Sequence, residues 1–489
     1  MIFSTLEFFV FFPIVVALFY LVPTRYRWIV LLVSSFFNLL TWKISYVYII
    51  IFATAAGYMS GITLETIKDK GKKKVFLILS LLFNVGLLFV FKYLGFFSEN
   101  IDFLFKNFGI KLSLVSFNNI LPIGISYYTF QLISYNVDIY NGKIKAERHP
   151  GYFIIYICFF LKVLSGPIER AGKFIPQLQI EKDFNYESVI NGSKRFLYGY
   201  FKKVVIADGI AYHFKNIYFN PVDYHGLSQI ISVLFYSIQI YADFSGYTDM
   251  ALGSAEILNI KLTDNFRYPY FSKSISDFWK KWHITLTSWL MEYLFLPLSY
   301  SFARKFIMMK RIKLKPDMWA YILSIFITMT ICGLWHGPKW TYIVWGMLHG
   351  FYLLIGFLTR KKRKKLYRTI GLNSKIRNTF SILFTFVLVS FAWIFFKSDD
   401  ISSAFMVIKN CFEPDFTFYF FKYKTEFIVL VLSIIIMFIL EFIQYRYNNK
   451  EGKYLEILVL LKWPVIILIL TLSILFQSGS KMDFLYFRF

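Results

Sequence analysis

Apolar stretches of about 20 residues, the length that a helix needs to cross a bilayer, recur along most of this 489-residue chain. Lipid offers no hydrogen-bond partner to an open backbone group, so segments of this kind are stable in a membrane only as helices or in a closed barrel. Hydrophobic residues make up 57% of the chain and aromatic residues 21%, more than a soluble domain can bury. The sequence therefore predicts an all-α polytopic membrane protein.

The spacing of these stretches predicts roughly 11–13 transmembrane or re-entrant helices. Three stretches, at 121–140, 189–209 and 275–298, carry charged side chains and are expected to re-enter the membrane or to line a cavity. The full set of apolar stretches lies at 2–22, 28–42, 44–63, 75–97, 121–140, 151–166, 189–209, 228–256, 275–298, 318–337, 340–358, 378–396, 426–444 and 461–477.

The basic residues predict how the chain is oriented. Its net charge is +25, from 54 Lys and Arg residues against 29 Asp and Glu residues, and in a soluble protein this excess would suggest nucleic acid. Here the basic residues gather in short loops, at 68–74, 304–315 and 361–368, as in the cytoplasmic loops of membrane proteins. We therefore expect no nucleic-acid partner. Counting spans from Arg25 and Arg27 places the N-terminus outside.

We expect a single integral membrane domain over residues 1–489. Its motif-bearing core should lie at about 121–350, with peripheral helices at 1–110 and 375–480. No internal repeat, heptad pattern or low-complexity linker divides the chain. The first apolar run lacks a basic start and a small-residue cleavage site, so it is expected to be a retained span. The three cysteines form no CxxC pair and are interpreted as packing residues.

Polar residues gather at two places inside otherwise apolar sequence. A charged side chain at the centre of a bilayer costs on the order of 2.5–3.5 kcal/mol, so such clusters need a reason. The first cluster runs from YADFSGYTDMALG at 241–253 into SISDFWKKWHITLTSWLMEYLFLPL at 274–298. In the second part of it, Trp279 and His283 would share one face of a continuous helix. The second cluster is GLWHGPKW at 333–340.

The second cluster combines a close helix contact with a helix break. Gly333 and Gly337 have the small-xxx-small spacing that lets another helix approach closely, and Pro338 marks a break just after His336. A histidine at such a break can face a cavity. From the residues alone, His336 is interpreted equally well as a packing residue and as a functional base.

Three of the six histidines lie in apolar helices, and the other three are expected to be solvated loop residues. A lone intramembrane histidine suits proton abstraction, because neutral imidazole is a base near pH 7 without a permanent charge. No HExxH, HxxxH, CxxC or GxSxG run occurs, and P-loop and dinucleotide-binding glycine patterns are absent. We predict no metal site and no bound cofactor. The helical histidines are His283, His336 and His349; the others are His149, His213 and His225.

Longer motifs extend through most of the chain and are together highly specific. They are MIFSTLEFFVFFP at the N-terminus, LPIGISYYTFQLISYNVDIY at 121–140, LSGPIERAGKFIPQL at 164–178, RFLYGYFKKVVIAD at 195–208, IQIYADFSGYTDMALG at 238–253, NFRYPYFSKSISDFWKKWHITLTSWLMEYLFLPL at 265–298, CGLWHGPKWTYIVWGMLHG at 332–350 and FLYFRF at the C-terminus. With these motifs the chain resembles the membrane-bound O-acyltransferases, and within them the bacterial branch of alginate and peptidoglycan O-acetyltransferases.

The resemblance implies a fold with a thinned centre, where a cytoplasmic passage for the acyl donor meets a funnel open to the outside. The family's near-invariant catalytic histidine falls on His336, and its second motif residue falls on His283. His336 would then take a proton from an acceptor hydroxyl, with His283 as oxyanion donor or orienting partner. Span counting places His336 near the outer end of 318–337, whereas this mechanism needs it midway.

Substrate contacts are expected from the aromatic and polar residues of the two clusters. The aromatic residues would shape the cavity walls, and the polar residues could line the passage. Buried polar residues that only tie helices together would look the same. The aromatic candidates are Trp279, Trp282, Trp335 and Trp340, and the polar ones are Gln239, Asp243, Ser245, Tyr247 and Asp249.

The function that the resemblance implies is transfer of an acetyl group from acetyl-CoA to a hydroxyl of a cell-surface polysaccharide, directly or through a secreted or membrane-anchored SGNH-type acyltransferase partner. The alternative within the family is a D-alanine exporter for teichoic acid, with a carrier-protein thioester as donor. A transporter, the alternative of another class, would predict internal repeats and paired broken helices, and we find neither. The expected location is the cytoplasmic membrane of a bacterium.

Overall fold

The computed structural model describes residues 1–106, 108, 122–219, 223–308, 316–371, 373–417, 424–448, 467–469 and 471–472. Helices form most of these parts, and no strand occurs among them, so the predicted all-α fold class is confirmed. The chain divides into two compact units, residues 1–196 with 248–263 and residues 197–247 with 264–489. The single domain with a core at 121–350 stays a prediction.

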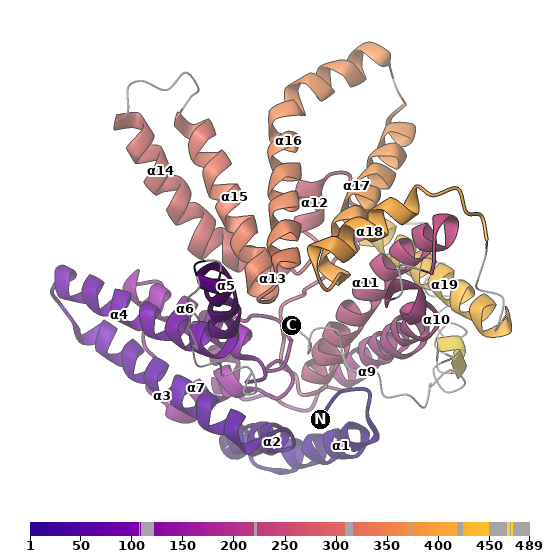
Figure 1. The fold of residues 1–489 in the computed structure, drawn as a ribbon. Helices are drawn as coiled ribbons and strands as arrows, with labels where there is room; N and C mark the ends of the chain where they lie inside the picture. Colours follow the sequence, from indigo (N-terminus) through magenta and orange to yellow (C-terminus); the bar gives the residue numbers. More distant parts are fainter. Residues whose placement is uncertain are drawn as a thin grey trace. The chain divides into compact units, whose positions relative to one another are not determined.

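The first unit opens with four helices, each of which contacts the next (Figure 1). The helix α6 packs on α3 and α4, and α7 packs on α2 and α3. The bounds in this unit are α1 (Leu6–Leu21), η1 (Thr24–Tyr26), α2 (Arg27–Leu40), α3 (Ile44–Thr66), α4 (Lys70–Leu88), the π-helical η2 (Phe89–Tyr93), α5 (Leu94–Lys106), α6 (Ile125–Tyr140), α7 (Pro150–Cys158), α8 (Ala171–Gln179) and most of α9 (Tyr186–Phe201).

Polar caps set where two of these helices begin. The Asp69 carboxylate accepts a hydrogen bond from the backbone N–H of Lys72 at 2.7 Å, at the start of α4. At the start of α7, His149 Nδ1 accepts from the backbone N–H of Tyr152 at 3.2 Å, and Pro150 fills the first helical position. His149 is therefore a half-buried cap rather than the solvated loop residue expected from the sequence.

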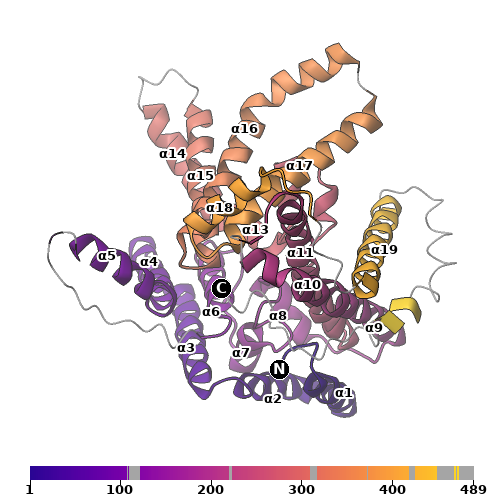
Figure 2. The same ribbon diagram turned by 45° about the vertical axis from the view of Figure 1, so that its right-hand side comes forward.

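The second unit contains a series of long helices, α14 to α17, in which each packs on the next (Figures 1 and 2). The helix α12 also packs on α16 and α17, so the ends of several helices meet near the start of α16. The bounds are η3 (Lys202–Ala207, π-helical), α10 (Asp208–Phe219), α11 (Gly226–Ile257, of which residues 248–257 belong to the first unit), η4 (Pro269–Phe271), α12 (Ile275–Trp279), α13 (Ile284–Leu290), η5 (Met291–Phe295, π-helical), α14 (Leu296–Met308), α15 (Pro316–His336), α16 (Trp340–Ile370), α17 (Ser374–Lys397), α18 (Ile401–Cys411) and α19 (Lys424–Asn448).

Seven helical segments in the described residues are long and apolar enough to cross a membrane. A multi-pass membrane protein is thereby confirmed. The helix α2 has 14 residues and is about 21 Å long, shorter than a hydrocarbon core of about 30 Å. The outside location of the N-terminus was predicted by counting α2 as a span. Both this location and the number of roughly 11–13 helices therefore stay predictions. The seven segments are Ile44–Thr66, Lys70–Lys106, Gly226–Ile257, Asp317–His336, Trp340–Ile370, Ser374–Lys397 and Glu426–Arg446.

Two apolar stretches are not single helices. The helix in 151–166 ends at Cys158, and residues 159–169 continue as a buried segment without regular structure. The stretch 275–298 is divided among α12, α13, η5 and the first residues of α14. The last stretch, 461–477, lies outside the described residues except for 467–469 and 471–472, and so does the C-terminal FLYFRF motif.

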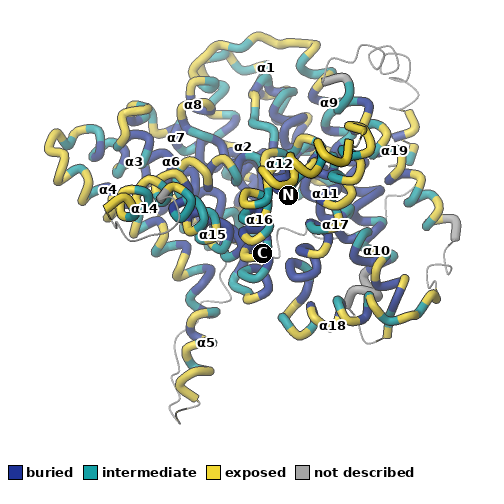
Figure 3. The backbone as a smooth tube through the Cα atoms, turned by 90° about the horizontal axis from the view of Figure 1, so that it is seen from above, coloured by how far each residue is buried: buried dark blue, intermediate teal, exposed yellow. Residues whose placement is uncertain are grey.

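Burial differs strongly among the helices (Figure 3). Of the seven candidate spans, α11 has the largest buried share, and it carries the polar cluster at 241–253. By contrast, the last residues of α5, from 103 to 106, are exposed. A helix that is buried on most sides must satisfy its polar side chains inside the protein, so the contacts of α11 decide what those residues do.

Candidate functional site

His336 is the last residue of α15, directly before the break that Pro338 predicts. Its side chain is 2% exposed and lies among aromatic rings from three helices. The imidazole centroid is 5.0 Å from that of Trp335, 5.1 Å from that of Trp345 on α16, and 5.1 Å from that of Phe396 on α17. The histidine is therefore held in a buried aromatic setting where the ends of α15 and α17 meet the start of α16.

Glycines allow α15 and α16 to approach closely at this point. A Cβ on Gly333 would lie 2.1 Å from the Tyr342 carbonyl oxygen, and one on Gly346 would lie 2.2 Å from the Met329 carbonyl oxygen. The close helix contact predicted for Gly333 is thus present, and Gly346 is its counterpart on α16. Gly337, by contrast, lies beyond the end of α15 and faces the ring of Tyr342.

Replacing Gly333 with alanine is expected to destabilise the protein by about 1–3 kcal/mol, because a backbone carbonyl cannot move aside as a flexible side chain can. A thermal melt of the purified protein in detergent would measure the loss. Gly86→Ala on α4 is the matched control, since nothing lies within 4 Å of its added Cβ. Equal melting temperatures for the two variants would contradict the expected contact.

His283 lies between α12 and α13 rather than within one helix. The prediction that Trp279 and His283 share a continuous helix face was therefore wrong. Residue 283 has φ 44°, in the left-handed region, which ends the helical path. Two backbone hydrogen bonds hold the break: Ile284 N–H donates to the Asn265 carbonyl at 2.9 Å, and Arg267 N–H donates to the Lys281 carbonyl at 3.0 Å.

Asn265, which the sequence analysis did not single out, organises the His283 break. Its side-chain oxygen accepts from the backbone N–H of Thr285 at 3.2 Å and from the Thr285 hydroxyl at 2.8 Å, and it lies 3.1 Å from His283 Nδ1. Because a backbone N–H can only donate, this amide atom is the oxygen. His283 Nδ1 therefore carries the proton, and in the neutral ring Nε2 is the basic nitrogen.

Replacing Asn265 with alanine is expected to lower acyl transfer at least about tenfold and stability by about 1–3 kcal/mol, because three buried donors lose one acceptor. Asn265→Asp keeps an acceptor at the same place and should retain more of both. Product formation in membranes and a detergent melt measure the two effects. Asn141→Ala, at an exposed position, serves as the control. An Asn265→Ala variant with full activity would show that the His283 orientation is not needed.

The two histidines predicted to be catalytic contact the same indole. The Trp335 ring centroid is 5.9 Å from that of His283 and 5.0 Å from that of His336. His283 also meets the edge of Phe244 on α11, with centroids 4.8 Å apart. Residues from two motifs that are about 50 positions apart in the sequence thus come together around Trp335.

The other tryptophans continue this aromatic cluster. Trp282 packs on Trp393 at 5.1 Å, and Trp393 stacks on Trp345 at 5.4 Å. Trp279 donates its Nε1–H to His349 Nδ1 at 3.3 Å, so His349 is tied into the aromatic cluster. Trp340, in contrast, is 53% exposed, so it lies apart from the buried rings.

The polar candidates on α11 have different surroundings. Asp243 is 2% exposed, and its Oδ1 lies 2.8 Å from Lys203 Nζ, which also lies 2.8 Å from Asp208 Oδ1. This ion pair suits the interpretation that Asp243 ties helices together. Ser245 is buried and Gln239 is half-buried. Tyr247 is buried as well, whereas Asp249 pairs with Arg195 at 3.0 Å within the first unit.

The family profile of MBOAT, the membrane-bound O-acyltransferase family, matches residues 148–394. This range includes His283, Asn265, Trp335 and His336, the residues that the fold brings together. The chain belongs to the membrane-bound O-acyltransferase family, and it is an O-acyltransferase.

Individual relatives cover most of the chain. A probable alginate O-acetylase from Pseudomonas syringae pv. tomato is 31% identical over 83% of this chain and 74% of its own length. A peptidoglycan O-acetyltransferase from Helicobacter pylori is 30% identical over 94% of this chain and 91% of its own length. A teichoic acid D-alanyltransferase from Bacillus subtilis is 29% identical over 58% of this chain and 69% of its own length.

Proposed function

We propose that this protein is an O-acetyltransferase that takes an acetyl group from acetyl-CoA on the cytoplasmic side. It passes the group across the membrane to a hydroxyl of a cell-surface polysaccharide, or to a partner acyltransferase that completes the transfer. The two relatives with the broader coverage, an alginate O-acetylase and a peptidoglycan O-acetyltransferase, support acetyl as the acyl group. Both also support a saccharide acceptor.

The observation that carries this proposal is the meeting of His336 and His283 on the indole of Trp335, at the point where several helices end. Helix packing alone does not require two histidines at the Trp335 ring, one of which, His283, has its proton fixed on Nδ1. His283 Nδ1 donates its proton to a hydrogen bond with the Asn265 oxygen, so the neutral imidazole presents Nε2 as a hydrogen-bond acceptor. The pair offers a base and an orienting group in one buried place.

In the proposed mechanism, His336 takes the proton of the acceptor hydroxyl while the hydroxyl oxygen attacks the thioester carbonyl. The new C–O ester bond forms, the C–S bond breaks, and the proton passes from His336 to the departing thiolate. General-base help of this kind is typically worth about 10²–10⁴ in rate. Neutral His283 presents an acceptor at Nε2, so it orients a donor group of the substrate rather than the oxyanion.

The surrounding side chains would complete the site. We propose that Trp279, Trp282 and Trp335 form its apolar walls and that Gln239 and Ser245 supply polar contacts to substrate. Asp243 would act through Lys203, by holding α11 in place, rather than by touching substrate. Acetyl-CoA would be the acyl donor, a carrier-protein thioester is the alternative donor, and we predict no bound cofactor.

The biological setting follows from the same proposal. The chain would lie in the cytoplasmic membrane of a bacterium, with its N-terminus outside and the basic residues at 68–74 and 361–368 inside. An SGNH-type acyltransferase, secreted or membrane-anchored, would be the partner that receives the acetyl group. Such a partner would place the acetyl group on the polysaccharide outside the cell.

A donor assay tests the proposed acyl group. The purified full chain in proteoliposomes would be given radiolabelled acetyl-CoA or a radiolabelled D-alanyl carrier protein, together with a hydroxyl acceptor: alginate, peptidoglycan fragments or teichoic acid. Alkali-labile label on the acceptor from acetyl-CoA is the expected result. Label from the D-alanyl carrier protein alone would overturn the acetyl proposal in favour of the D-alanine exporter, which the relative from Bacillus subtilis keeps as the second candidate.

A further inference from the structure

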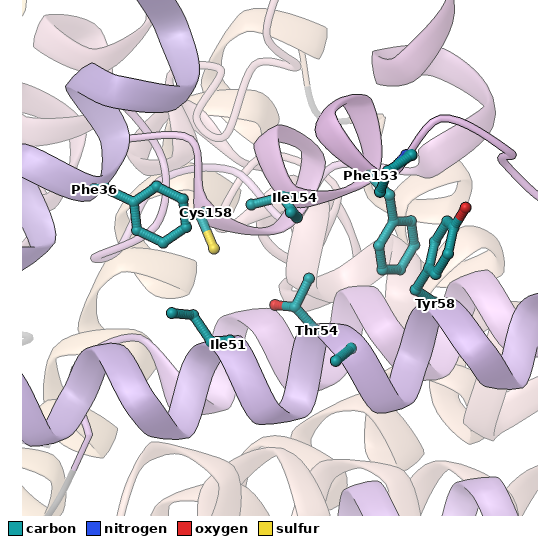
Figure 4. Close-up of a pocket in the computed structure, with 9 residues that line it drawn as sticks. Phe36, Ile51, Thr54, Tyr58, Phe153, Ile154 and Cys158 are labelled. Atoms are coloured by element: carbon teal, nitrogen blue, oxygen red, sulfur yellow. The ribbon is translucent and has the colours of Figure 1, made fainter. Parts of the chain in front are cut away.

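A cavity of about 220 Å³ opens within the first unit, between α2, α3 and α7 (Figure 4). Phe36 comes from α2, while Ile51, Thr54 and Tyr58 come from α3. Phe153 and Cys158, from α7, close the other side, and the Cys158 side chain is fully buried. The lining is hydrocarbon, aromatic ring and sulfur, which are the surfaces that an apolar ligand prefers.

The hydroxyl groups beside the cavity already donate elsewhere. Thr54 Oγ1 donates to the Ile50 carbonyl at 2.6 Å, and Tyr58 Oη donates to the Arg148 carbonyl at 2.6 Å. Neither proton is left for a polar ligand. Apolar cavities of about 150 Å³ stay dry and bind small hydrocarbons, so a cavity of this size and lining suits a hydrocarbon chain.

The position of the cavity along α3 indicates where such a chain would come from. This helix is one of the candidate spans, and Ile51 and Thr54 lie near its middle. Ile51 is 44% exposed and Ala55 is exposed, so the cavity opens on the outer face of α3. In a spanning helix this face meets lipid, and at mid-helix depth lipid presents only its acyl chains.

Charges gather at one end of the cavity. Tyr58 connects the lining to Arg148, whose side chain is 61% exposed and pairs with Glu65 at 2.5 Å. Lys143, on the same loop, pairs with Asp138 at 3.4 Å, so both of these cations have a carboxylate partner. The excess of positive charge at this end of α3 comes from the exposed lysines that follow the helix, Lys68, Lys70, Lys72 and Lys74. This end of α3 is therefore basic and wet, whereas its middle is apolar. A basic rim of this kind attracts an anionic lipid headgroup.

We propose that one acyl chain of an anionic membrane phospholipid occupies this cavity, with its headgroup phosphate near Arg148. A transmembrane helix of another protein is too thick for it, since a helix with side chains is about 10–12 Å across. The bound lipid would wedge α2, α3 and α7 together as a structural component of the first unit. The inference concerns residues of the first unit alone and does not depend on which acyl group the enzyme transfers.

Photocrosslinking tests the proposal with the full chain in proteoliposomes that contain phosphatidylglycerol with a diazirine in its acyl chain. After illumination, adducts are mapped by peptide mass spectrometry. Adducts should concentrate on peptides that contain 51–58 and 153–158. Ala55→Trp should lower the adduct yield on these peptides to the yield found on peptides from the exposed face of α4. Ala17→Trp is the matched control, because Ala17 is an exposed alanine on the apolar helix α1 of the same unit.

The headgroup part of the proposal has its own pair of variants. Arg148→Gln should weaken competition by phosphatidylglycerol relative to phosphatidylcholine, whereas Lys43→Gln, at the opposite end of α3, should not. An even spread of adducts over α3 and α4, or no effect of Ala55→Trp, would overturn lipid binding in the cavity. A larger effect of Lys43→Gln than of Arg148→Gln would place the headgroup at the start of α3 and overturn the proposed headgroup site. Crosslinks from the cavity residues to another protein, in native membranes, would show that a protein occupies the cavity and would overturn the lipid proposal.

Discussion

Replacing His336 with alanine is expected to reduce acyl transfer by a factor of at least about 10²–10⁴, the typical contribution of a general base. The variant loses the imidazole that would accept the hydroxyl proton, and no other side chain in the surrounding rings of Trp335, Trp345 and Phe396 can replace it. Ester-linked acyl groups released by alkali from the cell surface measure the loss in cells, and the proteoliposome assay measures it with purified protein.

Two companions separate chemistry from packing. His336→Asn keeps a polar side chain of smaller volume but lacks a basic nitrogen, so it should be as inactive as the alanine variant and melt closer to the natural protein. His213→Ala, on α10, should keep normal activity. Retention of acylation by both His336 variants, at normal expression and membrane insertion, would end the proposal that this histidine is the base.

Replacing Lys203 with methionine is expected to destabilise the protein by about 3–5 kcal/mol, because the substitution leaves buried carboxylates without their cation. Lys203 is 2% exposed, and its ammonium group lies 2.8 Å from Asp208 and 2.8 Å from Asp243. Methionine has a similar length and fills the space, so the effect isolates the charge. A fluorescence melt in detergent would record the change.

The same cluster predicts a rescue. Combining Lys203→Met with Asp208→Asn and Asp243→Asn removes all three charges together and should recover much of the lost stability, since an uncharged buried group costs less than an unpaired ion. Lys281→Met is the control: its pair with Asp277, at 2.9 Å, is partly exposed, and such pairs are worth only about 0–1 kcal/mol. A triple variant less stable than Lys203→Met would refute this account.

The long helices could be predicted from sequence because their apolar runs have few other stable states in a membrane. The spans at 44–63, 318–337 and 378–396 reappear as α3, α15 and α17 with ends shifted by a few residues. The break after His336 was predicted as well, since Pro338 cannot continue a helix. These features depend on local composition and backbone chemistry, which can be read directly from the amino-acid sequence.

The break at His283 could not be predicted in this way. The amino-acid sequence at 275–298 favours one continuous helix. In the structure, the backbone of Asn265 and Arg267 forms hydrogen bonds with this segment, and the left-handed conformation of His283 accompanies these bonds. Asn265 itself looks like an ordinary loop asparagine, since the three groups at its side-chain oxygen belong to two residues, His283 and Thr285, that are distant in sequence.

The amino-acid order alone was enough for an all-helical membrane protein and for the candidate histidines, because hydrophobic length and rare polar residues carry that information locally. Only the tertiary structure decided that His283 and His336 share the indole of Trp335, that Asp243 pairs with Lys203, and that α2, α3 and α7 leave a cavity. These are contacts between segments far apart along the chain. Their geometry depends on how helices pack, and hydrophobic periodicity does not specify which faces meet.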